Sequence, residues 1–339
     1  MTVTCDVIGI GAALVDVLAR CDDQFLIDQQ LTKGHMHLLN SAQANALQTQ
    51  FDTFDGVEMV SGGSAANTCL GVASFGGSAA FMGCVSNDWL GEFFASDLGK
   101  ANVTYTQLTA SGADQLGTGH CHCLITPDGE RTMCTFLGAS GSFGADAVSA
   151  DMVQNARLLF VEGYIWDTPS RAAAVDALIT AMKQKGGQVA LTLSDGWCAD
   201  KYRDIFMKYC NAGQVDVIFA NEEEIMTLTR TGTFEEATGL ARHLAPLLAL
   251  TRGARGAVVL KGDETVVIDP VPVDKLTDAT GAGDAFAAGF LYGYLNGSTL
   301  QQAGSMGAHA ASSVIQHIGA RPQVELSTFA DKVGFKKAA

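Results

Sequence analysis

The sequence predicts an α/β fold built on a doubly wound sheet, with helices on both faces. Short apolar runs bounded by Gly, Asn, Asp or charged residues alternate with helical patterns through most of the 339 residues. This alternation is typical of parallel strands connected by helices. Hydrophobic residues make up 47% of the chain, enough to bury a large core. We therefore expect a single α/β domain over 1–339.

The expected elements of this domain follow from the apolar patterns. Short continuous apolar runs predict strands that are buried on both faces. These runs are 5–11, 79–85, 157–163, 188–193, 215–221, 247–253 and 257–262. Helical periodicity that ends near a glycine predicts the helices between them. These segments are 64–76, 170–186, 234–245 and 283–295.

Two more polar stretches, at about 16–60 and 102–137, interrupt this rhythm. They contain strand-like pieces such as "HMHLL", "VEMVSGG" and "RTMCTFLGAS", and neither holds a clear strand–helix unit. We expect these two insertions to form a small β-rich lid beside the main sheet.

Charge and cysteine usage exclude several classes of protein. The formal net charge is −15 and only 21 residues are Lys or Arg, so nucleic acid is not an expected partner. The start of the chain, 1–14, lacks the basic and apolar regions of a signal peptide, and no apolar run reaches the length of a membrane span. The nine cysteines fit a reducing compartment in which thiols stay free. We expect a cytoplasmic protein without disulfides or membrane contact.

The segment "GHCHCLI" at 119–125 could suggest a zinc site. In a strand, His120 and His122 would share one face while Cys121 and Cys123 share the other. Four ligands therefore could not converge on one ion, and a second ligand pair at zinc-type spacing is missing. A partly buried strand is the preferred interpretation.

The segment "DATGAGDAFAAGF" at 278–290 places Gly281, Gly283 and Asp284 at the start of a predicted helix. Glycines there let an anion approach the free backbone N–H groups of the helix N-terminus. A carboxylate in contact with that anion would repel it, so we expect Asp284 to face a second substrate as a proton acceptor. This layout suits phosphoryl transfer. From the residues alone, a simple turn and helix cap is an equal alternative.

These residues resemble the ribokinase-like (PfkB) carbohydrate and nucleoside kinases, and within them the adenosine kinases and their bacterial relatives. "DATGAGDAFAAGF" resembles the C-terminal signature of the family and "SGGSAANTCLGVASFGG" its N-terminal glycine motif. "FLIDQQL", "FMGCVSNDWLGEFF", "VDVIFANEEE" and "AASSVIQHIGARP" follow in the family's order, so the resemblance covers nearly the whole chain. It implies a ribokinase-like three-layer α/β fold whose lid is formed by the two insertions.

The resemblance implies a catalytic role for the glycine turn. Asp284 matches the family's base, which accepts the proton of the acceptor hydroxyl as it attacks the γ-phosphorus of ATP. The N–H groups of Ala282, Gly283 and Asp284, with Gly281 shaping the turn, match its anion hole. Such preorganised donors are usually the largest catalytic contribution.

Cofactor contacts are also implied by the resemblance. Asn221 and Glu224 in "NEEE" match an element associated with Mg²⁺ and the ATP phosphates, with Glu224 acting on Mg²⁺ through water. First-turn carboxylates that favour the helix dipole are the other interpretation. Asp278 matches a position near a monovalent cation, K⁺. "TRGARG" resembles the nucleotide loop, although the same glycines suit a tight hairpin. Its expected nucleotide contacts are Thr251, Gly253 and Gly256.

On the substrate side, Asp16 matches a carboxylate that holds two neighbouring sugar hydroxyls. Gly62, Gly63 and Asn67 match the adjoining sugar contacts, and the same stretch could also simply open a helix. Arg131 resembles a basic residue that reaches the transferred phosphate, with an ordinary surface arginine as the alternative.

Two positions depart from the adenosine kinase pattern. Ala12 stands where those kinases carry Asn, and Met36 stands where animal adenosine kinases carry Gln. Met36, with Tyr164 or Trp166, could still pack on a purine face. We therefore expect phosphorylation of a ribonucleoside 5′-hydroxyl, with adenosine as the first candidate. A PfkB sugar kinase for ribose, fructose or a related sugar and a catalytically silent nucleotide-binding regulator are the alternatives. The sequence does not decide the oligomeric state.

Overall fold

The computed structural model describes residues 5–337. Residues 1–4 and 338–339 lie outside the described residues. Residues 1–4 belong to the segment that was predicted not to be a signal peptide, and 338–339 belong to the predicted domain over 1–339. Within 5–337, no helix combines the length and apolarity that crossing a membrane would require.

Among residues 5–337, the main sheet contains nine strands and includes all seven expected ones. Its strands are β1 (Cys5–Ile10), β5 (Ala79–Gly83), β6 (Val103–Gln107), β9 (Ala156–Val161), β10 (Gln188–Thr192), β11 (Val217–Asn221), β12 (Leu247–Thr251), β13 (Ala257–Lys261) and β14 (Glu264–Ile268). Their order is β14-β13-β12-β11-β10-β9-β1-β5-β6. The strands from β12 to β6 are parallel, and β13 and β14 extend the sheet as antiparallel neighbours.

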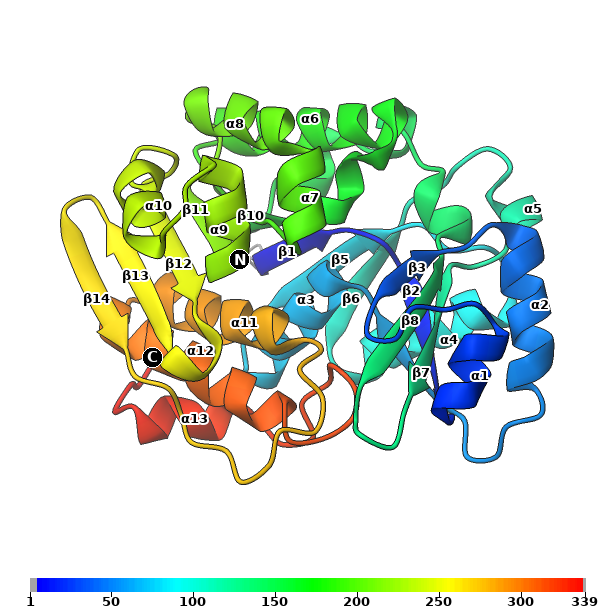
Figure 1. The fold of residues 1–339 in the computed structure, drawn as a ribbon. Helices are drawn as coiled ribbons and strands as arrows, with labels where there is room; N and C mark the ends of the chain where they lie inside the picture. Colours follow the sequence, from blue (N-terminus) through cyan, green and yellow to red (C-terminus); the bar gives the residue numbers. More distant parts are fainter. Residues whose placement is uncertain (1–4, 338–339) are drawn as a thin grey trace.

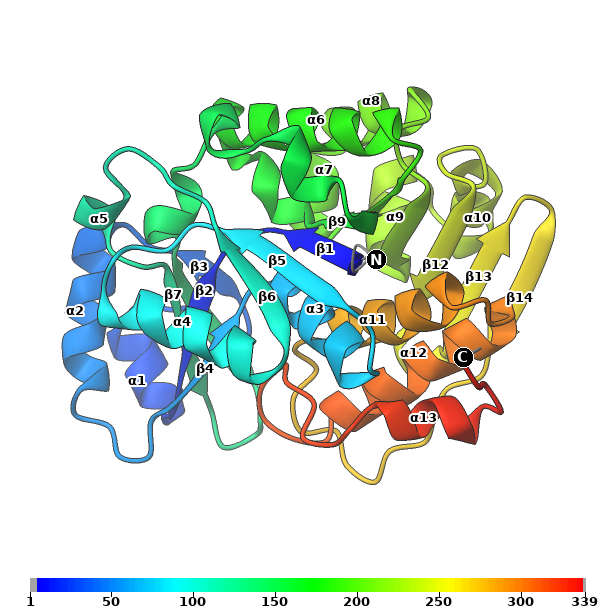
Figure 2. The same cartoon turned by 180° about the vertical axis from the view of Figure 1, so that it is seen from behind.

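Helices cover both faces of this sheet, so the predicted three-layer α/β architecture is confirmed (Figures 1 and 2). On one side, Ile8 and Ile10 of β1 share an apolar core with Val175 and Leu178 of a helix, whereas Val7 shares the other core with Phe290. The helices around the sheet are α3 (Ser64–Ser74), α4 (Trp89–Lys100), α5 (Ala113–Leu116), α6 (Pro169–Gln184), α7 (Gly196–Lys201), α8 (Arg203–Asn211), α9 (Glu222–Thr229), α10 (Phe234–Ala241), α11 (Ala282–Leu295), α12 (Leu300–Val314) and α13 (Ser327–Lys332).

In the described part of the chain, a second sheet of five strands lies beside the main one, with α1 (Asp23–Asp28) and α2 (Ser41–Phe51) next to it (Figure 1). Its strands are β2 (Leu14–Arg20), β3 (Met36–Leu38), β4 (Glu58–Gly62), β7 (His120–Ile125) and β8 (Arg131–Phe136). Their order is β3-β8-β7-β2-β4. The sheet thus joins two stretches that are distant in the sequence. That it acts as a lid stays a prediction.

One expected boundary of the insertions is wrong. The segment 102–137 was expected to lie wholly outside the main sheet, but β6 pairs in parallel with β5 as the edge strand of that sheet. Its sequence "VTYTQ" is polar and only Val103 is buried, because an edge strand has just one strand neighbour. β6 therefore lacks the continuous apolar run from which the seven expected strands were predicted.

The segment "GHCHCLI" forms the expected strand, β7. The rings of His120 and His122 lie on one face with their centroids 4.9 Å apart, and the ring of Phe51 from α2 packs against His122. The sulfur atoms of Cys121 and Cys123 lie together, 3.6 Å apart. The predicted separation of histidines from cysteines is therefore confirmed.

Helices α11 and α12 make an unusually close contact through two glycines. A Cβ atom added at Gly289 would lie 2.7 Å from the backbone nitrogen of Gly307 and 2.8 Å from the carbonyl oxygen of Met306. At Gly307 it would lie 2.6 Å from the carbonyl oxygen of Phe286. Since backbone atoms cannot rotate away as a side chain can, this contact fixes the position of α11 against its neighbour.

We predict that Gly289→Ala destabilises the protein by about 1–3 kcal/mol, as overpacking of a close contact does. Gly239→Ala is a matched control, because Gly239 also lies inside a helix but a Cβ there would meet no heavy atom within 4 Å. There the better helix propensity of alanine should leave stability unchanged or raise it by up to about 1 kcal/mol. Urea unfolding of both variants measures the difference; equal effects would contradict the close contact.

Candidate active site

The start of α11 carries Asp284 into contact with the start of α3. The Asp284 carboxylate accepts a hydrogen bond from Ser64 Oγ at 2.6 Å and one from Asn67 Nδ2 at 3.2 Å. Gly281, just before the helix, has φ 76°, a left-handed conformation that glycine adopts without strain. Asp284 is the third residue of α11 and does not cap it. The capping interpretation of this aspartate is therefore wrong.

Burial raises the pKa of Asp284 to about 6. The hydrogen bonds from Ser64 and Asn67 favour the carboxylate and limit this rise, whereas the nearby charge of Asp16 adds to it. A carboxyl group with such a pKa is ionised at neutral pH and still has appreciable proton affinity. Both properties suit a general base.

The backbone around Asp284 leaves room on the outer side of the turn. Gly283 is exposed, and no heavy atom lies within 4 Å of the position that its Cβ would take. The Ala282 N–H is one of the three expected anion-hole donors. It already donates to the Ala279 carbonyl oxygen at 3.2 Å.

The predicted sugar-binding residues lie beside this turn. Asp16 of β2 is buried, and a Cβ at Gly62 would lie 2.7 Å from its carboxylate. Gly63, with φ 96°, brings its backbone against the carbonyl oxygen of Ala12. Burial raises the pKa of Asp16 although the charges of Arg131 and Arg321 oppose the shift.

Arg131 is buried at 8% exposure, so the surface-arginine interpretation is wrong. Its Nη1 lies 2.7 Å from the Asp278 carboxylate, and its Nη2 lies 3.6 Å from Asp16 and 2.9 Å from Cys123 Sγ. The guanidinium therefore bridges the predicted sugar-binding carboxylate and the loop that leads into α11.

Asp278 is fully engaged by groups of the protein. Besides Arg131, the N–H groups of Thr280 and Gly319 donate to its carboxylate, each at 2.9 Å. Burial opposes its ionisation, but Arg131 and these donors outweigh that effect and lower its pKa. A monovalent cation bound by Asp278 would thus have to compete with Arg131.

Glu162, at the end of β9, is a site residue that the sequence interpretation missed. It is 1% exposed, and its carboxylate accepts the N–H of Ala12 at 2.7 Å and that of Ala65 at 3.1 Å. Burial raises its pKa to about 7, against the effect of these two donors. Glu162 thereby joins the loop after β1 to the first turn of α3. The signal was available, because an acidic residue directly follows the apolar run "RLLFV".

Asn221 and Glu224 form a capping box at the start of α9. Both Glu224 carboxylate oxygens are held by Asn221, one by the side-chain amide at 2.6 Å and one by the backbone N–H at 2.9 Å. Burial raises the pKa of Glu224 to about 7, and the charges of Asp195, Glu223 and Asp284 add to the shift. Direct metal ligation by Glu224 would break this box, so an indirect contact through water fits the arrangement better.

The predicted nucleotide loop follows β12, and Thr251 lies opposite Asn221 on the neighbouring strand. Gly253 and Gly256 have φ of 56° and 78° and form the tight link between β12 and β13. Arg252 and Arg255 of the same loop both pair with Glu222. These arginines supply positive charge that the sequence interpretation did not single out.

The three residues predicted to contact a base differ in their exposure and in their contacts. Tyr164 donates to the Asp195 carboxylate at 2.7 Å, and Met36 lies 39% exposed on β3. Trp166 is 4% exposed and packs on Tyr209 with ring centroids 5.0 Å apart. Trp166 therefore belongs to the core, and its predicted packing on a purine is wrong.

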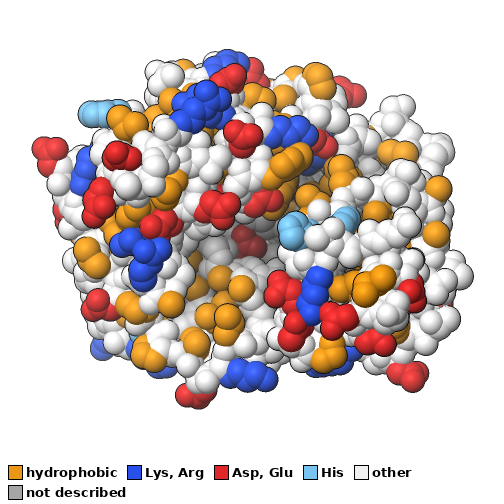
Figure 3. All heavy atoms as spheres, viewed as in Figure 1, with side chains coloured by type: hydrophobic (Ala, Val, Ile, Leu, Met, Phe, Trp, Pro, Cys, Tyr) orange, Lys and Arg blue, Asp and Glu red, His pale blue; other side chains and the backbone are white. Residues whose placement is uncertain are grey.

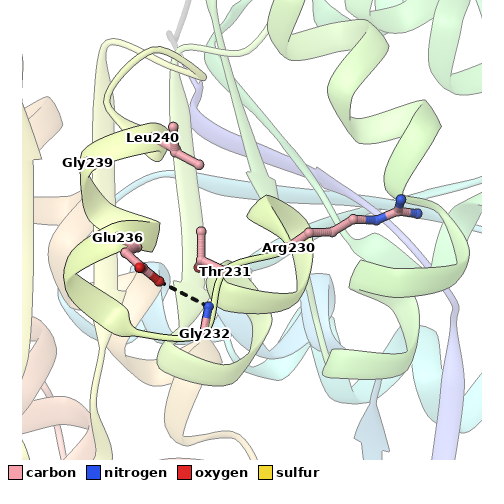
Figure 4. Close-up of a pocket in the computed structure, with 6 residues that line it drawn as sticks. All are labelled: Arg230, Thr231, Gly232, Glu236, Gly239 and Leu240. Carbon is pink, nitrogen blue, oxygen red and sulfur yellow. Dashed lines mark hydrogen bonds between the residues drawn. The ribbon is translucent and has the colours of Figure 1, made fainter.

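The space-filling view shows a hollow near the middle of the face drawn in Figure 1, with acidic side chains around its edge (Figure 3). A separate open depression of about 500 Å³ lies at α9 and α10 (Figure 4). There the Glu236 carboxylate accepts the Gly232 N–H, and the Arg230 side chain extends away from Glu236 and Leu240. The predicted catalytic and binding residues are all absent from the lining of this depression, so it is not the candidate site.

This chain is similar to known kinases in both sequence and fold. The solved structure of a probable sugar kinase protein from Rhizobium etli is 40% identical, with a TM-score of 0.90 over 98% of this chain and 99% of that one. The adenosine kinase structure from Sinorhizobium meliloti is 38% identical, with a TM-score of 0.89 over 97% and 99% of the two chains. Adenosine kinase of Saccharomyces cerevisiae is 26% identical over 338 residues, covering 93% of this chain and 96% of the yeast protein.

The sequence model described as pfkB family carbohydrate kinase matches residues 37–326. This range includes most of the five-stranded sheet, both glycine motifs and the turn that carries Asp284. The chain therefore belongs to the pfkB family of carbohydrate kinases and is a phosphotransferase with an alcohol group as acceptor.

Proposed function

We propose that this kinase transfers the γ-phosphoryl group of ATP to the 5′-hydroxyl of a ribonucleoside, with adenosine as the preferred acceptor. The products are then AMP and ADP. The observation that carries the proposal is the Asp284 carboxylate, which is held by Ser64 and Asn67 at the glycine turn with its pKa raised to about 6.

In this proposal Asp284 is the general base. As the 5′-oxygen attacks the γ-phosphorus, its proton passes to the Asp284 carboxylate and the bond from the γ-phosphorus to the β,γ-bridging oxygen breaks. Ser64 and Asn67 each hold one carboxylate oxygen, so the carboxylate is oriented before the hydroxyl arrives. Positioning of this kind is a large part of phosphoryl-transfer catalysis.

The first turn of α11 would receive the negative charge of the transferred group. Its free N–H groups and helix dipole favour an anion, and the open surroundings of Gly283 allow one to approach. Mg²⁺, when bound with ATP, would neutralise charge on the phosphates. Asn221 and Glu224 would hold it through water, because both carboxylate oxygens of Glu224 are already bonded.

Asp16 would accept hydrogen bonds from two neighbouring hydroxyls of the ribose, with Gly62, Gly63 and Asn67 beside it. Asn67 Oδ1 is buried and without a protein partner, which leaves it available to accept from a sugar hydroxyl. Adenosine is favoured as acceptor by the 38% identical adenosine kinase from Sinorhizobium meliloti. Tyr164 and Met36 would supply the apolar contacts to the base.

A sugar kinase is the second candidate. The 40% identical structure from Rhizobium etli is described as a probable sugar kinase protein. Ala12 offers its backbone N–H to Glu162 and has no polar side chain for a nucleoside. The same base and turn would then phosphorylate a free ribose, fructose or a related sugar.

We predict that Asp284→Asn lowers kcat by about 10²- to 10⁴-fold, roughly 3–5 kcal/mol of transition-state stabilisation, because the proton acceptor is lost. Adenosine and ATP binding and the melting temperature should change little, since asparagine is nearly isosteric. Asp204→Asn is the control, a first-turn helix carboxylate whose side chain is 97% exposed. Activity of Asp284→Asn within about tenfold of the wild type would exclude the catalytic assignment.

We predict that kcat/KM for adenosine falls as the pH drops through about 6 and is constant above it, because Asp284 must be ionised to act as the base. Ser64→Ala removes a hydrogen bond that favours the carboxylate, so the acid limb should shift to higher pH. Initial rates across pH 5–8, with folding checked by circular dichroism, measure both profiles. A profile without an acid limb would contradict the assignment.

We predict a higher kcat/KM for adenosine than for ribose or fructose at the same ATP concentration. The nucleoside offers the same hydroxyl pair to Asp16 and adds contacts of the base. A coupled assay of ADP formation compares the three acceptors directly. If a free sugar gives the higher value, the sugar-kinase candidate replaces the nucleoside kinase.

A further inference from the structure

Asp16 of the predicted sugar site, Cys121 and Cys123 bring three metal-binding atoms together. The two sulfur atoms are 3.6 Å apart, and both sulfur atoms and an Asp16 oxygen lie within 4.8 Å of one another. All three residues are buried, and Asp16, at 8% exposure, is the one most open to solvent. The phosphoryl transfer proposed above uses neither cysteine.

The backbone of the five-stranded sheet fixes this cluster. Strands β2 and β7 are parallel neighbours, and their register places Asp16 directly opposite Cys121. Cys123 follows two residues later on the same strand, so both cysteine side chains leave the same face. The sequence excluded four ligands from one strand, but it could not reveal a third ligand supplied by the neighbouring strand.

The spacing of the two sulfur atoms matches a metal-bridged pair better than a disulfide. Two thiolates bound to tetrahedral zinc at ~2.3 Å lie ~3.8 Å apart, close to the observed 3.6 Å. A disulfide would require an S–S distance of ~2.05 Å and a Cα–Cα distance of at most ~6.8 Å. Residues two apart on a strand are already separated by ~6.6–6.8 Å.

We propose that Asp16, Cys121 and Cys123 form an inhibitory site for a thiophilic divalent cation such as Zn²⁺ or Cd²⁺. The ion is bound by two thiolates and one carboxylate oxygen, and water completes the tetrahedron. Binding releases the two thiol protons to solvent, and no electrons are transferred. The three ligands and the ion together carry one negative charge.

Arg131 accounts for that remaining charge. Its Nη2 donates to Cys123 Sγ at 2.9 Å, and a metal-bound thiolate can still accept such a hydrogen bond. Its Nη1 keeps the Asp278 carboxylate at 2.7 Å as a partner. The guanidinium thus stays next to the cluster and neutralises it.

The functional consequence rests on the proposed function. Asp16 is the carboxylate proposed to bind the sugar hydroxyls, and it cannot serve both a metal ion and these hydroxyls with the same oxygen atoms. Metal and nucleoside binding are therefore mutually exclusive, and Zn²⁺ inhibits competitively with respect to the acceptor substrate.

The direct test uses Cd²⁺ alone, without substrate, on the full chain. We expect one Cd²⁺ per chain in equilibrium dialysis and an ultraviolet thiolate-to-cadmium charge-transfer band. Cys121→Ser and Cys123→Ser should each weaken binding at least about 100-fold, because even changes outside the first ligand shell cost about 10- to 100-fold. Cys210→Ala is the control, a buried cysteine of α8 in the core of the main domain. It should bind Cd²⁺ as the wild type does.

Unchanged Cd²⁺ binding in both serine variants would overturn the site, provided that thermal melts show them folded. If a variant does not fold, Asp16→Asn replaces it, since it keeps both thiols and should weaken Cd²⁺ binding while retaining the charge-transfer band at saturation. A steady-state assay with Zn²⁺ tests the consequence separately. If Cd²⁺ binds to the chain but Zn²⁺ does not compete with the acceptor, the inhibitory role is overturned and the metal site stands. The binding test without substrate therefore judges the metal site independently of the proposed function.

Discussion

The candidate site depends on the packing of the N-terminus of α11 against the N-terminus of α3. Ser64 and Asp284 are 220 residues apart in the chain, and their 2.6 Å hydrogen bond exists only because these two helices meet. Both helices start at glycines in conformations that side chains rarely adopt, Gly63 and Gly281. Asn67, one of the predicted sugar contacts, belongs to α3, and the predicted base belongs to α11, so this single contact aligns the base with the predicted sugar site.

A second constraint is the concentration of carboxylates around that contact. Asp16, Glu162, Glu224 and Asp284 all have raised pKa values, in each case mainly because of burial. For Glu162, Glu224 and Asp284 this rise is opposed mainly by hydrogen bonds from backbone N–H groups and neutral side chains, whereas for Asp16 it is opposed by the charges of Arg131 and Arg321. For Glu162 and Glu224, with pKa values of about 7 in the folded protein, the folded state binds more protons than the unfolded one between about pH 4.5 and 7. Their contribution to stability is therefore largest in acid and falls as the pH rises through this range.

The sequence predicted the main architecture well because apolar runs report burial directly. All seven expected strands lie in the main sheet, since each is buried on both faces. β6 was misplaced because edge strands lose that apolar pattern. Motif residues such as Asp284 and Asn67 could be named because their motifs resemble those of a known family. The pairing of Arg131 with Asp278 could not be predicted, because it depends on a contact between a strand and a loop that only the fold brings together. Glu162 was missed although its place directly after an apolar run was a signal.

The ion pair between Arg131 and Asp278 connects the five-stranded sheet to the loop at the start of α11. Arg131 belongs to β8 of the five-stranded sheet, whereas Asp278 lies in the loop that leads into α11. Separating a buried pair of this kind leaves two uncompensated charges, which is strongly unfavourable unless a new partner replaces the old one. Under the proposed function, an anion at the α11 turn would be such a partner for the guanidinium. Anion occupancy and the relative orientation of the two sheets would then be thermodynamically linked, and by reciprocity a change in that orientation would alter the affinity for the anion.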